Sequence, residues 1–174
     1  MGKSKFRNWI ILGVCVGTLC VGIVWHFYVP GPQIKYSKVT ITDHFDKTLF
    51  VRGQQHPVDF IGNTTSIVAM VIPHHTVAAP ILSAAWNRIH AVSPPCILLF
   101  GPNHLEVGKT PFLAAIREWE TPFGVVFPVT RTEKLPDTVA QDAAGIAKDQ
   151  SFAAQMPYLK TYLPDATVFP ILVS

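Results

Sequence analysis

Hydrophobic positions in the middle of the chain follow a strand, helix and strand pattern. Residues 66–72 are apolar and largely β-branched without polar alternation, which predicts a strand buried on both faces. Residues 77–90 carry apolar side chains at helical spacing, with Pro80 in the first turn, where proline is tolerated. Residues 96–100 form a second apolar run. Together these segments predict a right-handed βαβ unit with two parallel strands.

Shorter elements are expected around this unit. Further strands are predicted at 36–42, 112–116, 125–130 and 167–173, helices at 133–147 and 151–163, and a loop with one helical turn at 43–60. Residues 119–124 form a predicted turn, so the strands on either side of it make a hairpin-like excursion. Ser151 is the expected N-cap of the last helix, and Pro157 is expected to kink it. We therefore predict an α/β fold, a mostly parallel sheet with helices on both faces.

The N-terminal part of the chain has a different pattern. Residues 9–29 are an almost unbroken apolar run, which as a helix would span about 31 Å and match a bilayer core. A cleavable signal peptide is the alternative, but the run is longer than a usual signal core and no small-residue cleavage site follows it. We interpret it as one uncleaved transmembrane helix. Because Lys3, Lys5 and Arg7 precede it, the N-terminus is expected in the cytoplasm and the domain on the outer side of the membrane.

This pattern divides the chain into four parts. They are a cytoplasmic tail at 1–8, a transmembrane anchor at 9–29, a linker and N-terminal segment at 30–65, and an α/β domain at 66–174. The chain stops at Ser174, directly after a predicted core strand, whereas domain termini usually lie in exposed segments. We therefore expect the domain to be incomplete at its C-terminus.

Charge and cysteine content narrow the function classes. The formal net charge is +3, and the three cations of the N-terminal tail account for all of it. The remainder is neutral and has no basic stripe, which argues against a nucleic-acid partner. Of the three cysteines only Cys96 lies in the predicted domain, where we expect a small buried hydrophobic residue. No disulfide can form within the domain, and no CxxC spacing is present.

Two histidines follow the two strands of the βαβ unit. His74 comes directly after the first strand, and His104 leaves the end of the second through a Gly-Pro-Asn turn. Ligands bind at the carboxyl ends of strands in open α/β sheets, so both imidazoles are expected at one edge. If the strands are neighbours, the rings can reach one metal ion at roughly 2.0–2.1 Å each. The alternative is that both histidines merely cap strand ends.

Three other residues are candidates for the site. His44 and His56 could be extra ligands, but nothing places them at a strand end, which favours ordinary surface histidines. Glu120 could line the cleft, while its neighbour Trp119 is expected to pack in the core.

Five motifs in order give the chain a resemblance to a known family. They are Val71-Ile72-Pro73-His74, Gly101-Pro102-Asn103-His104, Trp119 to Gly124, Ser151 to Pro157 and Phe169 to Val173. In this order and spacing they resemble the Memo family, also called AmmeMemoRadiSam system protein B, which is similar in fold to class III extradiol dioxygenases. The resemblance covers residues 66–174. It implies that His74 and His104 are metal ligands, and that a third ligand comes from a C-terminal half that this chain does not contain.

The chain departs from the family pattern at two places near the expected site. Asp149-Gln150-Ser151 stands where the family often has Glu-His-Ser, and Ala153 replaces a frequent acidic residue. His75-Thr76-Val77 stands where small residues and Gly-Tyr are usual. His75 and Gln150 are then the nearest candidates to orient the ligands. These departures affect catalysis more than metal binding.

The resulting expectation is a membrane-anchored Memo-like protein with a metal site at His74 and His104. The resemblance implies redox or dioxygenase-like chemistry with a divalent ion, iron or copper rather than zinc. The alternatives are a non-enzymatic module that binds a small molecule or peptide, and an inactive fragment. Whether the chain is an enzyme is left open.

Overall fold

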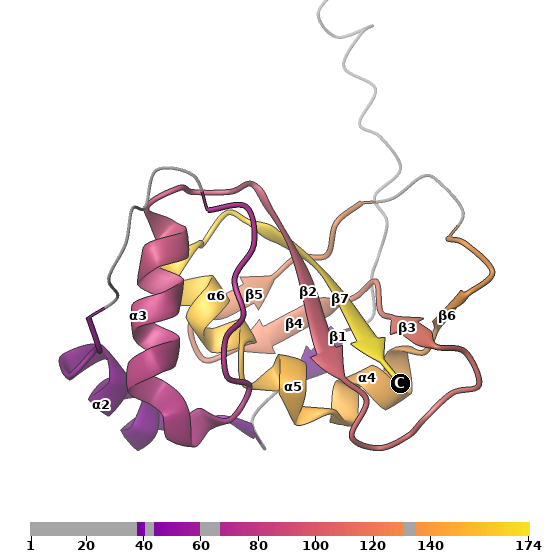
Figure 1. Cartoon of the computed structure of the whole chain (residues 1–174), viewed down its shortest axis with the longest axis horizontal. Helices are drawn as coiled ribbons and strands as arrows, with labels where there is room; N and C mark the ends of the chain where they lie inside the picture. The colour runs from indigo at the N-terminus through magenta and orange to yellow at the C-terminus, as the bar shows by residue number, and fades with distance from the viewer. Residues whose placement is uncertain (1–37, 41–43, 60–66, 131–134) are drawn as a thin grey trace, which may run out of the picture. The chain divides into compact units, whose positions relative to one another are not determined.

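The computed structural model describes residues 38–40, 44–59, 67–130 and 135–174 (Figure 1). The expected cytoplasmic tail at 1–8, the anchor at 9–29 and part of the linker at 30–65 lie outside these residues. Within the described ranges, no helix is both long and apolar enough to cross a bilayer.

The elements of this part of the chain are short apart from one helix and two strands. The helices are α2 (Lys47–Gln55), the 3-10 turn η2 (Thr76–Ala78), α3 (Ala79–His90), α4 (Ala143–Lys148), α5 (Gln150–Ala153) and α6 (Met156–Tyr162). The strands are β1 (Lys38–Thr40), β2 (Cys96–Pro102), β3 (Phe112–Ala114), β4 (Glu118–Thr121), β5 (Gly124–Val126), β6 (Val139–Gln141) and β7 (Thr167–Val173).

These strands form two mixed sheets. One has the order β2-β7-β3-β6 and the other the order β1-β4-β5. Parallel pairing joins β2 to β7, β3 to β6 and β1 to β4, whereas β3 to β7 and β4 to β5 are antiparallel. Figure 1 shows β2 and β7 as long arrows that point the same way. The prediction of an α/β fold with mostly parallel pairing is therefore confirmed.

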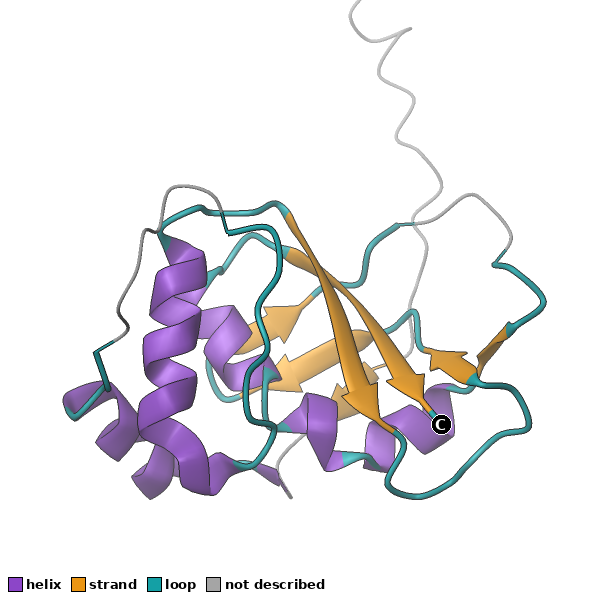
Figure 2. Ribbon diagram, viewed as in Figure 1, coloured by secondary structure: helices purple, strands orange, loops and turns teal. Residues whose placement is uncertain are grey.

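The main core lies between the larger sheet and the helices. It joins one face of β2, β7 and β3 to α2, α3, α4, α5 and α6 and to β4 and β5 of the smaller sheet, and its largest buried side chains include Trp86, Phe152 and Leu159. Figure 2 shows α3 and α6 packed next to each other beside the sheet. The opposite face carries a second cluster around Phe169 and Ile171, to which strand and loop residues contribute but no described helix does. The prediction of helices on both faces is therefore wrong for the described residues.

The predicted strand at 66–72 is absent, as far as the structure describes it. Ser66 lies outside the described residues, and residues 67–72 belong to no strand. Val68 and Val71 expose 98% and 101% of their surface, so neither side chain is buried. Because a strand is defined by hydrogen bonds to a neighbour, a β-branched sequence alone does not form one. Among the described residues β2 pairs only with β7, and its other edge is free.

An uncovered face of β2 explains an error at Cys96. This residue begins β2 and is exposed, not buried as predicted. Side chains alternate between the two faces of a strand, and Leu98 and Phe100 lie on the same uncovered face as Cys96, with 54% and 57% of their surface exposed. The run is apolar throughout, so the sequence does not reveal that only one of its faces is covered.

Two predicted connections are different in the structure. Residues 118–121 are strand β4, and the tight turn of the hairpin lies at residues 122–123, between β4 and β5. The hairpin partner of β5 is thus β4, and the predicted strand at 112–116 is β3 of the other sheet. Residues 133–134 of the predicted helix at 133–147 lie outside the described residues, and the rest of that range contains strand β6 followed by the start of the short helix α4.

In place of the predicted loop with one helical turn at 43–60, the described residues contain the complete helix α2. The nine residues of α2 begin after Asp46, whose carboxylate accepts a hydrogen bond from the Leu49 amide at 3.0 Å. Only Phe50 and Gly53 of this helix are buried. Gly53 lies against α3 so closely that an added Cβ would be 2.5 Å from the Ala79 carbonyl oxygen. A glycine at the contact removes the apolar side chain that would have marked the helix in the sequence.

Three further predicted elements are present in the structure. Helix α3 with η2 covers the predicted helix at 77–90, and Pro80 lies in its first turn. Strand β7 is the predicted buried strand at 167–173. The predicted helix at 151–163 is interrupted as expected from Pro157, giving α5 and α6. Its N-cap is Asp149 and not Ser151, since the Asp149 carboxylate accepts from the Ser151 amide at 2.8 Å.

Candidate metal site

A buried glutamine holds the segment that carries His74. The Gln155 side chain donates from Nε2 to the Pro73 carbonyl oxygen at 3.0 Å, and its Oε1 accepts from Trp86 Nε1 at 2.9 Å. Gln155 is almost completely buried between α5 and α6. This chain of hydrogen bonds ties residue 73 to α3, so His74 has a defined position although the segment before it is not part of a sheet.

A buried asparagine shapes the turn that carries His104. The Asn103 amide donates to the Val107 carbonyl oxygen at 2.8 Å and to Ser174 Oγ at 2.9 Å, while Asn103 Oδ1 accepts from the Val107 backbone at 3.2 Å. The Asn103 backbone N–H donates to the Val173 carbonyl oxygen at 3.0 Å. His104 therefore leaves β2 at the carboxyl edge shared with β7, as predicted.

Gly101 lets a helix approach this turn. An added Cβ at Gly101 would be 2.9 Å from Ser151 Cβ and 3.0 Å from Phe152 Cε1. Since both contacts are with α5, a larger residue at position 101 would separate that helix from β2. The close approach places Asp149 and Ser151, at the start of α5, beside His104.

The structure brings the two predicted histidines together. The ring centroids of His74 and His104 are 4.8 Å apart, with an angle of 46° between the rings. The His75 ring lies 4.3 Å from the His74 ring, tilted by 38°, and 6.5 Å from the His104 ring. The rings meet although residues 67–72 do not form a strand, because Gln155 and Asn103 hold the two loops separately.

The surroundings of His74 favour the neutral form of its side chain. Its Nε2 is buried and has no hydrogen-bond partner among the described residues. Burial is the main cause that lowers the pKa of His74 below its ordinary value, and the neighbouring His75 and His104 lower it further, while Asp149 acts in the opposite direction. A neutral imidazole with an unpaired ring nitrogen is the form that binds metal ions.

His104 contacts a buried carboxylate. Asp149 has 1% of its surface exposed and accepts from the His104 backbone N–H at 3.0 Å. Asp149 Oδ1 lies 3.2 Å from His104 Nδ1, and Ser151 Oγ lies 3.1 Å from the same ring nitrogen. Burial acts to raise the pKa of Asp149, but hydrogen bonds from Ser151 and His104 outweigh it, so the pKa is lowered and the group is an anion at neutral pH.

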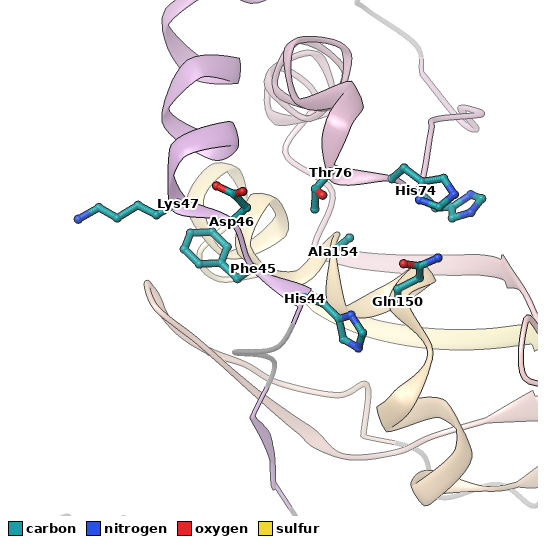
Figure 3. Close-up of a pocket in the computed structure, with 9 residues that line it drawn as sticks. His44, Phe45, Asp46, Lys47, His74, Thr76, Gln150 and Ala154 are labelled. Carbon is teal, nitrogen blue, oxygen red and sulfur yellow. The ribbon is translucent and has the colours of Figure 1, made fainter.

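A cavity of about 540 Å³ adjoins His74. Its lining combines the start of α2 with the His74 loop and α5, namely His44, Phe45, Asp46, Lys47, His74, His75, Thr76, Gln150 and Ala154. Figure 3 shows His44 and Gln150 on the side of the pocket where His74 lies, whereas the Lys47 side chain points away. His104 is not part of the lining, so the histidine pair lies at the border of the cavity.

The other sequence candidates have different positions. His44, taken as a surface residue, lines the cavity, whereas His56 is exposed at the C-cap of α2. Glu120 does not line the cavity and pairs with Lys38 at 3.4 Å. Trp119 is fully buried, as predicted. No group of three or more potential metal ligands occurs in the part of the chain that the structure describes.

Comparison with known proteins identifies the family. A model of the Memo-like protein family matches residues 47–174. A "MEMO1 family protein" of Caldivirga maquilingensis is 24% identical over 129 residues, which is 70% of this chain and 45% of the relative. The Nitrosopumilus maritimus protein of the same name is 25% identical over 124 residues, 67% of this chain and 45% of the relative. One from Thermotoga neapolitana is 29% identical over 119 residues, 63% of this chain and 42% of the relative.

These matches set the extent of the resemblance. The chain matches less than half the length of these curated relatives. No solved structure matches the chain significantly, so the expected similarity in fold to extradiol dioxygenases stays a prediction. The matched region begins at the first residue of α2 and includes both histidines of the site. The chain belongs to the Memo-like protein family.

Proposed function

We propose that this Memo-like protein binds a divalent metal ion, iron or copper rather than zinc, through His74 and His104. The observation that carries the proposal is the pairing of two imidazoles 4.8 Å apart, one of which has a buried nitrogen without a hydrogen-bond partner among the described residues. A buried polar atom without a partner is costly, and a metal ion would satisfy it. The residues present therefore fit two positions of a coordination sphere.

The remaining positions of that sphere must come from elsewhere. Since the described residues contain no third protein ligand, water, a bound ligand or a donor outside these residues would complete it. A bound iron or copper ion would supply redox chemistry with open coordination positions. The chain itself would supply two neutral ring nitrogens and, next to them, the cavity lined by His44 and Gln150. This arrangement is the basis for the dioxygenase-like activity that we propose.

Metal binding is tested by removing both imidazoles. Full-length protein is expected to bind one equivalent of Fe²⁺ or Cu²⁺, measured by calorimetric titration and elemental analysis. The His74→Ala, His104→Ala double variant is expected to lose the ion, with affinity reduced at least about 100-fold, since two of the ligands are gone. His56→Ala is the matched control, because this histidine is exposed on α2 and should not affect binding. Binding that survives in the double variant would contradict the proposal.

We further propose that residues 9–29 anchor the protein in a membrane, with residues 1–8 in the cytoplasm and the domain on the outer side. The proposal is supported by the 21-residue length of the apolar run and by the three cations before it. Full-length protein is expected to stay in the membrane pellet after carbonate extraction, and a chain starting at residue 31 is expected in the supernatant. Protease added to intact cells or spheroplasts should cleave the domain. Release of the full chain by carbonate would refute the anchor.

The cavity favours a second function, the binding of a small molecule or peptide without catalysis. Its volume of about 540 Å³ and its lining of histidine, threonine and glutamine side chains suit a small polar ligand. Metal-free protein that keeps its fold and binds such a ligand would favour this function over the metal-dependent one.

A further inference from the structure

The contacts of Asp149 exceed what a helix cap needs. To begin α5 it is enough that Oδ1 accepts from the Ser151 backbone N–H, at 2.8 Å. The carboxylate makes further contacts, two of them with His104. Oδ2 accepts from the His104 backbone N–H at 3.0 Å, and Oδ1 faces the His104 ring at Nδ1, 3.2 Å away. One buried side chain therefore holds both the backbone and the ring of the same residue.

The contacts of the Ser151 hydroxyl indicate where the ring proton lies. Ser151 Oγ is 3.2 Å from the Pro102 carbonyl oxygen, which can only accept, and 3.1 Å from His104 Nδ1. Its single proton can serve one acceptor at a time, and the Asp149 carboxylate is a third neighbour, with which the Ser151 side chain also hydrogen-bonds. If the proton goes to Pro102 or to Asp149, Nδ1 must carry a proton of its own, which it donates to Asp149 Oδ1 and Ser151 Oγ. The ring nitrogen, the hydroxyl and the carboxylate then all have partners.

The opposite assignment leaves conflicts. A bare Nδ1 would place its lone pair against an oxygen of the buried carboxylate, at 3.2 Å. The Ser151 proton would have to turn to Nδ1, and the Pro102 carbonyl oxygen would lose it. Because two acceptor lone pairs facing each other beside a buried carboxylate are costly, the network favours the first assignment.

We propose that Asp149 is a positioning residue that keeps neutral His104 in its Nδ1–H tautomer, so that the bare Nε2 is the atom offered to the metal ion. The inference rests on the proposed metal site and deepens it, since it names the ligand atom and the group that orients it. A carboxylate behind a ligating histidine fixes the ring orientation and makes the ligand more basic, and its loss typically reduces metal affinity 10–100-fold.

The tautomer can be read without any metal. Full-length protein labelled with ¹⁵N-histidine is examined metal-free by long-range ¹H–¹⁵N NMR, at a pH about 1.5 units above the ordinary histidine pKa of about 6.5. The chain contains its own standard, because His90 Nδ1 lies 2.6 Å from the Tyr162 carbonyl oxygen and must donate to it. His104 is expected to give the same Nδ1–H pattern as His90. An Nε2–H pattern for His104 would overturn the proposal.

Two variants separate the carboxylate from the hydroxyl. Asp149→Asn keeps the size and the capping oxygen but turns one acceptor into a donor, so it is expected to lose the preference for Nδ1–H and to bind Cu²⁺ 10–100-fold more weakly. Ser151→Ala keeps the carboxylate and is expected to retain the tautomer and most of the affinity. Asp149→Asn with both properties unchanged would overturn the proposal, as would a change of tautomer in Ser151→Ala alone.

These experiments also distinguish a failure of this inference from a failure of the proposed metal site. If wild-type protein binds no Cu²⁺ or Fe²⁺, the proposed function fails while the tautomer measurement still decides the role of Asp149. If metal binds and His104 is in the Nε2–H form, only the positioning role is lost. Should Asp149→Asn not fold, the wild-type spectrum remains a sufficient test.

Discussion

Replacing Phe152 by alanine is expected to cost about 3–5 kcal/mol of the free energy of unfolding. Phe152 lies in α5, is completely buried, and belongs to the main core with Trp86 and Leu159. Truncation removes the transfer free energy of the ring and leaves a cavity that surrounding helices fill only in part. For a domain of this size the melting temperature should fall on the order of 10 °C. Urea unfolding followed by circular dichroism measures the loss.

The same substitution should also weaken the metal site. The Phe152 ring lies against Gly101, and α5 begins at the carboxylate that holds His104. A loosened α5 is expected to reduce metal affinity in addition to stability. Phe127→Ala is the matched control, because Phe127 exposes 52% of its surface and its loss should cost less than about 1 kcal/mol. Equal losses in the two variants would show that Phe152 is not a core residue.

Replacing Gln155 by leucine is expected to cost about 2–6 kcal/mol. The substitution leaves two groups without their partner, the buried Trp86 indole N–H and the half-buried Pro73 carbonyl oxygen. Each unsatisfied buried group costs about 1–3 kcal/mol. Because Gln155 also holds the residue before His74, metal affinity should fall with stability. Chemical unfolding and Cu²⁺ titration of the same samples measure both effects.

Coupling between the two hydrogen-bonded side chains can be isolated. In a double-mutant cycle, Trp86→Phe and Gln155→Leu together should cost about 1–3 kcal/mol less than the sum of the single losses, since the second substitution removes a partner that is already lost. Gln141→Leu, at an exposed position of β6, makes the same chemical change and should be nearly neutral. Strict additivity in the cycle would mean that the buried hydrogen bond does not contribute.

The parts of the fold that the sequence predicted are those with long, continuous signals. Helix α3 and strands β2 and β7 have runs of apolar residues that leave little choice of element. Helix α2 was missed because its contact with α3 uses a glycine, Gly53, and not an apolar stripe. Residues 67–72 have the composition of a strand, but the pairing that makes a strand depends on a neighbour, which a local pattern does not report.

The candidate site was predictable only in outline. The rule that ligands gather at strand ends predicted that His74 and His104 lie together, and the structure places their rings 4.8 Å apart, although the segment before His74 is not a strand. It did not show how they are held, because Gln155, Asn103 and Asp149 act across long sequence separations. In the sequence, Asp149 stands out only as a departure from the family pattern. Its position directly before a helix could have suggested a cap, but not a contact with a histidine 45 residues earlier.

The unpaired edge of β2 affects how the chain can aggregate. Residues 96–100, Cys-Ile-Leu-Leu-Phe, are uncharged and rich in residues that favour cross-β stacking, and their outer edge is unpaired in the described part of the chain. Pro94 and Pro95 precede this segment, and Pro102 ends the strand. Proline has no backbone N–H, so another chain that added to this edge would meet an interruption at each end. The flanking prolines act as gatekeepers that limit how far aggregation can propagate from this strand during synthesis and folding.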